Sequence, residues 1–307
     1  MKDKNQINNL LVIGGTGFIG YNILRYMSKP GWKLTSASRK KPSKKRIVKK
    51  VKYLKIDINK KIEIKKKLNK NYSHIINLVG NTKNIVSRKN KNFIVKNQYE
   101  STKNIIDFFK KKKIKKFIQV GSAAEYGSLK LPHKESKQCF PISEYGKEKL
   151  KATKYLIKNS KKNSMPSLII RLFQVYGPGQ SNDKIVPYIL NSCLFKKQFI
   201  IKNKNSTRDF IHINDMCNAV YILLKNKNLK KDIFNLASGK ETSIKELTNI
   251  IKKKVGKGNP LFETAKNNYN QIKKSKACIK NIKSVGWKPK ITLDKGITSM
   301  IKNNHEK

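Results

Sequence analysis

Residues 9–20 read NLLVIGGTGFIG, a short apolar run that leads directly into a glycine-rich turn. The run has the length of a buried strand, and a helical pattern follows the turn as far as about Ser28. Glycines at Gly14, Gly17 and Gly20 allow the backbone to approach a pyrophosphate closely, and the N–H groups that begin the helix bind it. The stretch predicts a dinucleotide-binding turn, and the alternative is a turn of purely structural use.

Strand-like and helical runs alternate over the first half of the chain. Strands are predicted at 9–14, 34–37, 51–56, 74–79, 117–120 and 167–173, with further helices at 62–68, 92–112 and 144–158. This alternation predicts a parallel sheet covered on both faces. The pattern becomes irregular after residue 179, and residues 232–237 are expected to return to the main sheet. We therefore expect an α/β fold, a doubly wound parallel sheet with a smaller C-terminal lobe, divided into residues 1–175 and 176–307.

The charge of the chain has two possible explanations. The 307 residues carry a formal net charge of +53, which comes almost entirely from lysine spread from end to end. The many Asn and Ile residues favour a bias towards AT-rich codons, and the alternative is an electropositive surface for nucleic acid or an anionic membrane. We favour the first explanation and do not expect nucleic acid as a partner. Arginine is rare, so an arginine at a motif position is more informative than a lysine.

Further features bear on location and on metals. No apolar run approaches the roughly 20 residues that span a bilayer, and the polar N-terminus leads into a run too short for a signal peptide. We expect a cytoplasmic protein with no membrane partner. The four cysteines are far apart and form no Cys-x-x-Cys pair, so we expect reduced thiols and neither a disulfide framework nor a metal site.

The end of the second predicted strand bears on the choice between NAD and NADP. Enzymes that use NAD usually place an acid there to bind the ribose hydroxyls. This chain has no acid between Asp3 and Asp57, and Ser38 and Arg39 stand where a 2′-phosphate would lie. We favour NADP over NAD, although the general scarcity of acids is another explanation. Asp57 ends the third strand and is a candidate acceptor for the adenine amine or an N-cap of the next helix.

Ser122, Tyr145 and Lys149 form a candidate catalytic set. Tyr145 and Lys149 lie one helical turn apart on one face, and Ser122 ends a strand at the sheet edge where ligands bind. A tyrosine with a pKa of about 10 is a poor base, and lowering that pKa by about three units takes roughly 4 kcal/mol. An ammonium at about 4 Å supplies roughly this amount. We expect hydride transfer in which Tyr145 moves the hydroxyl proton, Lys149 lowers its pKa and Ser122 holds the substrate oxygen.

With several further motifs, these residues resemble the extended short-chain dehydrogenase/reductase family of nucleotide-sugar epimerases, dehydratases and reductases. The further motifs are Asn77-Leu78-Val79-Gly80, Asn97 with 101–104, and the stretches 171–179, 208–215 and 286–289. The resemblance covers nearly the whole chain. It implies a Rossmann-type dinucleotide-binding domain, a C-terminal lobe that clamps a nucleoside-diphosphate sugar, and a homodimer built from the two long helices.

The motifs and the resemblance together assign residues to each ligand. The residues assigned to the dinucleotide are Gly14, Thr16, Gly17, Phe18, Ile19, Gly20, Ser38, Arg39, Asp57, Ile58, Leu78, Val79, Asn97, Tyr145 and Lys149. The resemblance implies that Gln174 and Lys184 line the substrate site. It also implies that Arg208 contacts the nucleotide or diphosphate of the substrate, against a surface or interface role.

Two departures from the family pattern reduce the number of candidate reactions. Ala123 and Ala124 stand where the family's 4,6-dehydratases have an Asp-Glu pair that performs the elimination, so we do not expect a dehydratase. Gln174 stands where many relatives have Asn. Residues 175–189 resemble reductases of CDP- or dTDP-linked sugars, so the leading hypothesis is an NADP-dependent reductase of a nucleoside-diphosphate 4-keto-(6-deoxy)hexose. The alternative is an NAD-dependent nucleotide-sugar 4-epimerase similar to UDP-glucose 4-epimerase, and a remote one is a non-enzymatic nucleic-acid-binding relative.

Overall fold

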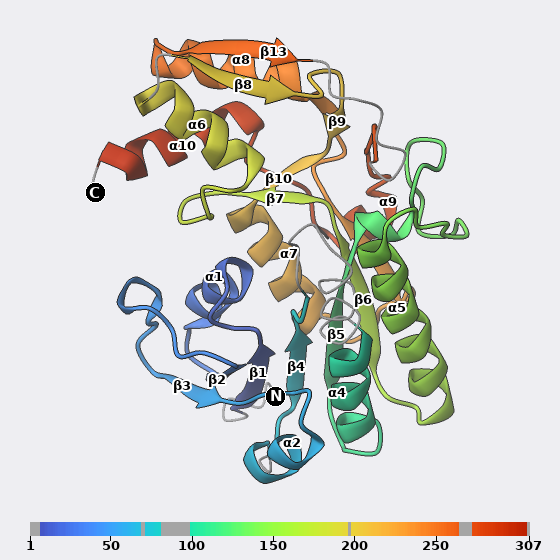
Figure 1. Ribbon diagram of the computed structural model, residues 1–307. Helices are drawn as coiled ribbons and strands as arrows, with labels where there is room; N and C mark the ends of the chain where they lie inside the picture. Colours follow the sequence, from blue (N-terminus) through green and yellow to red (C-terminus); the bar gives the residue numbers. More distant parts are fainter. Residues whose placement is uncertain (1–6, 69–70, 81–98, 196–197, 264–271, 306–307) are drawn as a thin grey trace.

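A seven-stranded parallel sheet forms the centre of the molecule (Figure 1). The computed structural model describes residues 7–68, 71–80, 99–195, 198–263 and 272–305. In chain order the strands are β1 (Asn8–Ile13), β2 (Trp32–Ser38), β3 (Val51–Lys55), β4 (His74–Asn77), β5 (Lys116–Ser122), β6 (Ser167–Leu172) and β11 (Ile233–Leu236). Their order in the sheet is β11-β6-β5-β4-β1-β2-β3. Successive strands are added on one side of β1 up to β3 and on its other side from β4 onward. A doubly wound sheet binds its ligand at this change, between β1 and β4.

Helices cover both faces of this sheet. Side chains alternate along β1, so that Leu10 and Val12 belong to one apolar core and Leu11 and Ile13 to the other. The first core contains α1 (Phe18–Met27) and α7 (Ile213–Lys225), and the second contains α2 (Lys61–Lys67), α4 (Ser101–Phe109) and α5 (Glu144–Lys162). β1 and β6 are buried on both faces and are almost continuously apolar, whereas the edge strand β3 exposes Lys52 and Lys55.

The predicted elements correspond to the observed ones, and the fold class is confirmed. The strand expected near 232–237 is β11, which pairs in parallel with β6 from Ile233 opposite Ile169 to Leu236 opposite Leu172. The long helix expected at 92–112 is described from Ser101 onward as α4, and Asn97 lies outside the described residues.

A second, smaller core lies above the C-terminal ends of the strands (Figure 1). Its elements are α6 (Ile185–Phe195), α8 (Ile244–Val255), α10 (Leu293–His305) and the parallel pair β8 (Gln198–Lys202) and β13 (Asn259–Glu263). Two short strand pairs connect it to the sheet, β7 (Gln174–Tyr176) with β10 (Phe210–His212) and β9 (Thr207–Arg208) with β12 (Thr242–Ser243). The residues after 176 therefore contribute to both parts of the molecule, because α7, β11 and Trp287 pack in the core of the main sheet.

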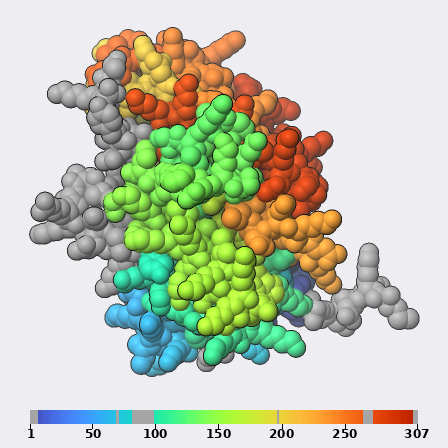
Figure 2. All heavy atoms as spheres, turned by 90° about the vertical axis from the view of Figure 1, so that its right-hand side faces the viewer, coloured from blue at the N-terminus to red at the C-terminus, as the bar shows by residue number. Residues whose placement is uncertain are grey.

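Figure 2 shows one side of the molecule, where residues of α5 and of the loop before it occupy the middle of the face. Within the described ranges, none of the helices combines the length and the apolar character that crossing a membrane requires.

Three buried histidines are expected to make the fold sensitive to acid. Burial lowers the pKa of His74, His133 and His212 to about 4, and nearby lysines add to the effect for His74 and His133. The unfolded chain has histidine pKa values near 6.5, so it takes up protons as the pH falls below that value while the folded chain does not. The free energy of unfolding should therefore fall between pH 7 and pH 5, by about 2 kcal/mol for each histidine.

Guanidinium unfolding at pH 7, 6 and 5 measures this dependence. His74→Gln should make the dependence on pH shallower, whatever it does to the stability at pH 7. An unchanged dependence on pH in His74→Gln would show that His74 titrates alike in both states.

Candidate active site

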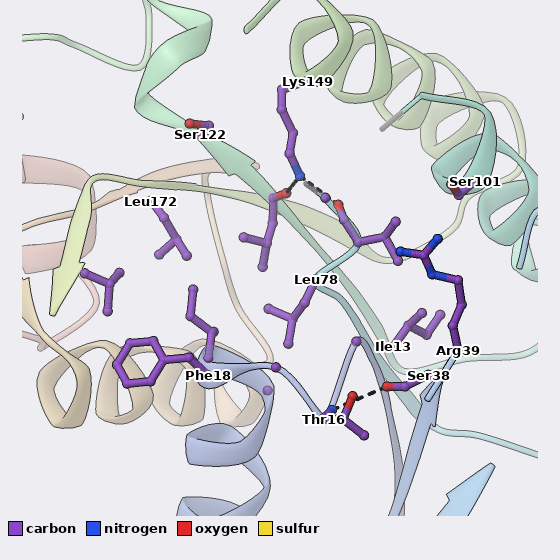
Figure 3. Close-up of a pocket in the computed structure, with 18 of the residues that line it drawn as sticks. Ile13, Thr16, Phe18, Ser38, Arg39, Leu78, Ser101, Ser122, Lys149 and Leu172 are labelled. Atoms are coloured by element: carbon purple, nitrogen blue, oxygen red, sulfur yellow. Dashed lines mark hydrogen bonds between the residues drawn. The ribbon is translucent and has the colours of Figure 1, made fainter. Parts of the chain in front are cut away.

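A cavity of about 1030 Å³ opens at the C-terminal ends of β1, β4, β5 and β6 (Figure 3). Its volume is at the upper end of the range for ligand pockets, which suits a long ligand. Most of the residues assigned from the sequence line this cavity, namely Gly14, Thr16, Gly17, Phe18, Ile19, Gly20, Ser38, Arg39, Ile58, Leu78, Val79, Ser122, Tyr145, Lys149, Gln174 and Lys184. Segments separated by more than a hundred residues therefore meet around one space.

The glycine turn has the shape that a pyrophosphate requires. Gly14 has a φ of +84°, and a Cβ on Gly20 would collide with the Gly14 carbonyl. Gly17 is the N-cap of α1, and a Cβ there would meet only the Gly14 oxygen at 3.4 Å, since this position borders the cavity. The first turn of α1 holds no acidic residue, so its N–H groups and its dipole are available to an anion. A dinucleotide fits this turn.

The end of β2 lies beside the same turn. Ser38 Oγ accepts a hydrogen bond from the Thr16 N–H (3.3 Å), and the contact is drawn in Figure 3. Arg39 follows directly and also lines the cavity. No carboxylate is among the residues that line it, so the described wall offers the ribose a hydroxyl and a guanidinium instead of an acid.

Asp57 is turned towards its own loop and is not among the residues that line the cavity. Its Oδ1 accepts hydrogen bonds from the backbone N–H and the side-chain amide of Asn59, both at 3.0 Å. Asn59 and Ser101 line the cavity in its place, and Ser101 Oγ donates to Asn59 Oδ1 (3.2 Å). The N-cap of α2 is Lys60, so Asp57 does not cap that helix. Ser101 begins the motif 101–104, but the sequence analysis assigned neither Ser101 nor Asn59 to a ligand.

The three candidate catalytic residues come from two elements. Ser122 ends β5, and Tyr145 and Lys149 lie on α5, whose first turn is capped by Ser143 Oγ accepting the Gly146 N–H (3.1 Å). Lys149 Nζ donates to the backbone oxygens of Val79 (2.8 Å) and Val120 (3.0 Å) and lies 6.0 Å from the centre of the Tyr145 ring. These bonds fix the ammonium between the ends of β4 and β5 (Figure 3).

The electrostatics of the site differ in one respect from the sequence-based expectation. Burial raises the pKa of Tyr145 to about 12, although a hydrogen bond with the Ser122 side chain acts in the opposite direction. Burial also lowers the pKa of Lys149 to about 8. The pKa of Tyr145 therefore stays well above 7 in the protein alone, despite the nearby Lys149. The loss of hydration raises this pKa more than the hydrogen bond with Ser122 lowers it. At pH 7 the groups of the protein hold Tyr145 as a neutral phenol, the form that donates a proton.

The far end of the cavity is formed by Gln174 and by the loop that precedes α6. Gln180, Ser181 and Lys184 line the cavity there, and Gln180 Nε2 donates to the Val175 oxygen (2.8 Å). The buried Oε1 of Gln180 has no hydrogen-bond partner among the described residues. This amide oxygen is an acceptor available to a ligand, and the sequence did not indicate it.

Arg208 does not line the cavity, and Arg46 has a place that the sequence did not indicate. Arg208 donates to the oxygens of Thr207 (2.7 Å) and Lys273 (3.4 Å). Arg46 was not singled out from the sequence, yet it donates to the Thr16 oxygen (3.3 Å) and the Gly179 oxygen (3.0 Å). It thus connects the glycine turn to the loop at the far end of the cavity.

The four cysteines are free thiols. In the part of the chain that the structure describes, no group of three His, Cys, Asp or Glu side chains is arranged to hold a metal ion.

Comparison with known proteins identifies the family. The sequence model described as "NAD dependent epimerase/dehydratase family" matches residues 10–237. The chain is 29% identical to a putative UDP-glucose 4-epimerase of Methanocaldococcus jannaschii, covering 96% of this chain and 99% of that one. It is 28% identical to a dTDP-4-dehydro-6-deoxyglucose reductase of Escherichia coli, covering 96% and 97%.

The solved structure of the Thermotoga maritima UDP-glucose 4-epimerase with UDP-glucose superposes with a TM-score of 0.90 at 20% identity, covering 97% of this chain and 99% of that one. This likeness concerns the fold. The family match spans the glycine turn, the Ser122, Tyr145 and Lys149 set and the returning strand β11. The motifs, the sheet order and this match agree, and the chain is an enzyme of the NAD-dependent epimerase/dehydratase family.

Proposed function

We propose that this enzyme moves a hydride between a bound nicotinamide dinucleotide and carbon 4 of a nucleoside-diphosphate sugar, with 4-epimerisation as the net reaction. The observation that carries the proposal is that Ser122, Tyr145 and Lys149 line the same cavity as the glycine turn. The full-length likeness to a putative UDP-glucose 4-epimerase supports the epimerase, the alternative from the sequence, more than the reductase.

In this proposal the residues of the chain bind and orient the sugar and move one proton. When bound, NAD or NADP supplies the hydride acceptor and donor. Ser122 Oγ holds the sugar hydroxyl next to Tyr145, which in its ionised phenolate form takes the hydroxyl proton on oxidation and, as the phenol, returns it on reduction. A positive charge brought into the cavity adds to that of Lys149 and lowers the pKa of Tyr145 from about 12, because tyrosinate is stabilised by opposite charge.

The short helix after β5 supports hydride transfer without elimination. η3 (Ala123–Glu125) places two methyl groups after Ser122, and neither transfers a proton. Glu125, the third residue, is fully buried and is already held by hydrogen bonds. We therefore propose that the enzyme does not act as a 4,6-dehydratase.

Conversion of UDP-glucose with no more than a catalytic amount of NAD tests this function. An epimerase regenerates its dinucleotide in every turnover, so the protein should form UDP-galactose in large excess over NAD, and proton NMR distinguishes this product from the substrate. Failure to interconvert any UDP-hexose, together with NADPH oxidation in the presence of a CDP- or dTDP-linked 4-keto-6-deoxyhexose, would exclude the epimerase in favour of the reductase.

The NADP-dependent reductase is the second candidate, and the end of β2 favours it. Ser38 and Arg39 line the cavity where an NAD enzyme has an acid, and a reductase draws its hydride from NADPH. The similarity to a dTDP-4-dehydro-6-deoxyglucose reductase adds support.

Arg39→Ala should weaken NADPH binding by about 10- to 100-fold while leaving NADH binding unchanged. A hydrogen bond to a charged group contributes about 1.5–3 kcal/mol, and NADH lacks the phosphate that would accept it. Fluorescence titration with each dinucleotide measures the two affinities. Arg25→Ala, on the exposed surface of α1, removes the same charge and serves as the control. Equal losses for NADH and NADPH would mean that Arg39 does not recognise the phosphate.

Further assignments complete the proposal. We propose that residues 1–175 bind the dinucleotide and that 176–307 mainly bind the sugar nucleotide, with Gln174 and Lys184 at the sugar end of the cavity. We propose that Arg208 contacts the nucleotide or diphosphate through Nε or Nη2, since both of its backbone hydrogen bonds use Nη1. We also propose a cytoplasmic homodimer assembled through α4 and α5.

A further inference from the structure

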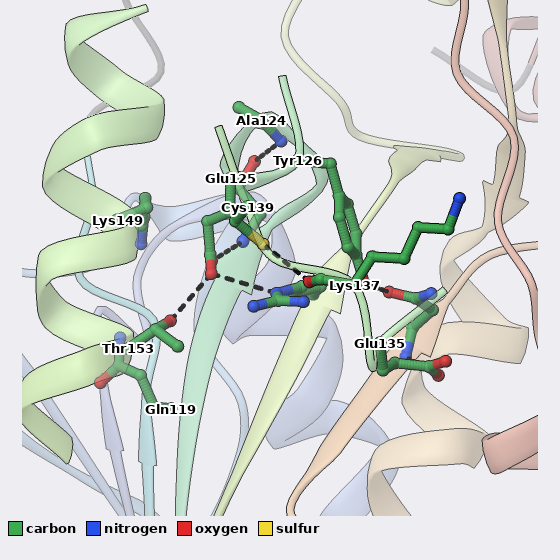
Figure 4. A network of polar contacts seen from close by, with 12 residues as sticks. Gln119, Ala124, Glu125, Tyr126, Glu135, Lys137, Cys139, Lys149 and Thr153 are labelled. Carbon is green, nitrogen blue, oxygen red and sulfur yellow. Dashed lines mark hydrogen bonds and ion pairs between the residues drawn. The ribbon is translucent and has the colours of Figure 1, made fainter. Parts of the chain in front are cut away.

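One buried carboxylate connects the two halves of the catalytic set. Glu125 is fully buried, and its Oε1 accepts the N–H of Ser122 (2.8 Å). Its Oε2 accepts hydrogen bonds from Thr153 Oγ1 (3.0 Å) and from Arg171 Nε (3.1 Å). These contacts are drawn in Figure 4. A single side chain thus contacts the end of β5, the middle of α5 and β6.

The contact with α5 falls on the face of the helix that bears the catalytic residues. Thr153 follows Lys149 by four residues and Tyr145 by eight, which places all three on one side of the helix. Glu125 therefore ties Ser122 directly to that face. Ser122 is held a second time, because its Oγ accepts the Ala124 N–H (3.1 Å) in a capping box.

The surroundings of Glu125 are built around its carboxylate. A Cβ on Gly121 would collide with Glu125 Oε1, so a larger residue before Ser122 would displace the carboxylate. The Arg171 side chain is 4% exposed and balances the buried negative charge, and its guanidinium lies 4.6 Å from the centre of the Tyr126 ring. Replacing one partner would leave the other buried and unpaired, so this ion pair is a fixed part of the structure.

We propose that Glu125 is a positioning residue that fixes Ser122 relative to Tyr145 and Lys149, so that the three converge on one substrate oxygen. The proposal rests on the hydride-transfer function proposed above. Glu125 does not line the cavity and acts only through its partners. Its charge also raises the pKa of Lys149, which opposes the effect of burial and favours the ammonium form.

Thr153→Val tests the proposal because it removes one hydrogen bond at nearly constant volume and leaves the Glu125–Arg171 pair intact. We expect kcat to fall by about 10- to 100-fold, since small displacements of a catalytic group have effects of this size. The KM for the nucleotide sugar should change by less than about threefold, as expected when ground-state binding is unaffected. Thr153→Ser, which keeps the hydroxyl, should restore the rate.

Hydrogen exchange measured by mass spectrometry gives a readout that needs no turnover. The Ser122 amide should exchange about tenfold faster in Thr153→Val than in the wild type, because its acceptor loses an anchor. The matched control is Thr248→Val in α8, another buried threonine, whose Oγ1 donates to the Ile244 oxygen (2.7 Å). It should change neither kcat nor the exchange of the Ser122 amide.

The outcomes separate this proposal from the proposed function. Absence of turnover in the wild type refutes the function, while exchange at Ser122 still decides the role of Glu125. Unchanged exchange and unchanged kcat in Thr153→Val would overturn the positioning role. Should that variant not fold, Glu125→Gln replaces it, because it keeps an acceptor for the Ser122 N–H but offers an amide to Thr153 and Arg171. Wild-type exchange and kcat in Glu125→Gln would overturn the proposal equally.

Discussion

Tyr145→Phe should lower kcat by about 10²- to 10⁴-fold while leaving the affinities for dinucleotide and nucleotide sugar nearly unchanged. The substitution removes only the phenol oxygen, which is the atom that carries the proton in the proposed reaction. The ring, which lines the cavity, is kept. Steady-state rates and calorimetric titrations measure the two quantities separately.

Tyr155→Phe is the matched control for this prediction. Tyr155 lies on the same helix, and its hydroxyl donates to Asp107 Oδ1 (2.6 Å) away from the residues that line the cavity. Its kcat should stay within about twofold of the wild type. If Tyr145→Phe kept more than a tenth of the wild-type kcat, Tyr145 would not be the proton-transfer group.

Lys149→Met should abolish measurable turnover and weaken dinucleotide binding. The ammonium that stabilises the ionised form of Tyr145 is lost, and so are the donors to Val79 and Val120. The partly buried Val79 oxygen loses its donor, whereas the Val120 oxygen still accepts from Gln119 Nε2 (3.2 Å). A buried acceptor left unpaired costs about 1–3 kcal/mol, so the variant should also be less stable. Its activity must therefore be compared per folded molecule, at a temperature where circular dichroism shows the native state.

Lys116→Met provides a control with the same chemistry elsewhere. Lys116 is also buried, and its Nζ donates to the backbone oxygens of Leu223 and Asn226 at the other end of the sheet. It should lose stability as Lys149→Met does and keep its kcat. Similar kcat values for the two variants would show that Lys149 has only a structural role.

The parts of the fold that were predictable are those that local sequence determines. The apolar run before Gly14 and the glycines after it require a strand, a tight turn and a helix in that order, and β1 and α1 follow. The spacing of Tyr145 and Lys149 fixes their common face once α5 forms. The rule that ligands bind at the carboxyl ends of parallel strands then predicted that Ser122 lies near them, without any knowledge of the sheet order.

The contacts that the sequence did not indicate join residues far apart in the chain. Arg46 and Gly179 are separated by 133 residues, and Glu125 and Arg171 by 46. Neither pair leaves a periodic or local pattern. Asp57 is the opposite case, a residue that the sequence indicated but that does not line the cavity. Its carboxylate accepts two hydrogen bonds from Asn59 instead. The choice of dinucleotide likewise depends on a few side chains and not on the fold.

The fate of a deuterium at carbon 4 tests hydride transfer most directly. UDP-glucose labelled with deuterium at carbon 4 is incubated in ordinary water with the enzyme loaded with NAD and no further dinucleotide, and the product is analysed by NMR and mass spectrometry. The account predicts UDP-galactose that keeps the deuterium at carbon 4, because the hydride stays on the enzyme between the two steps. Product that has lost its deuterium to water, or no product at all, would contradict it.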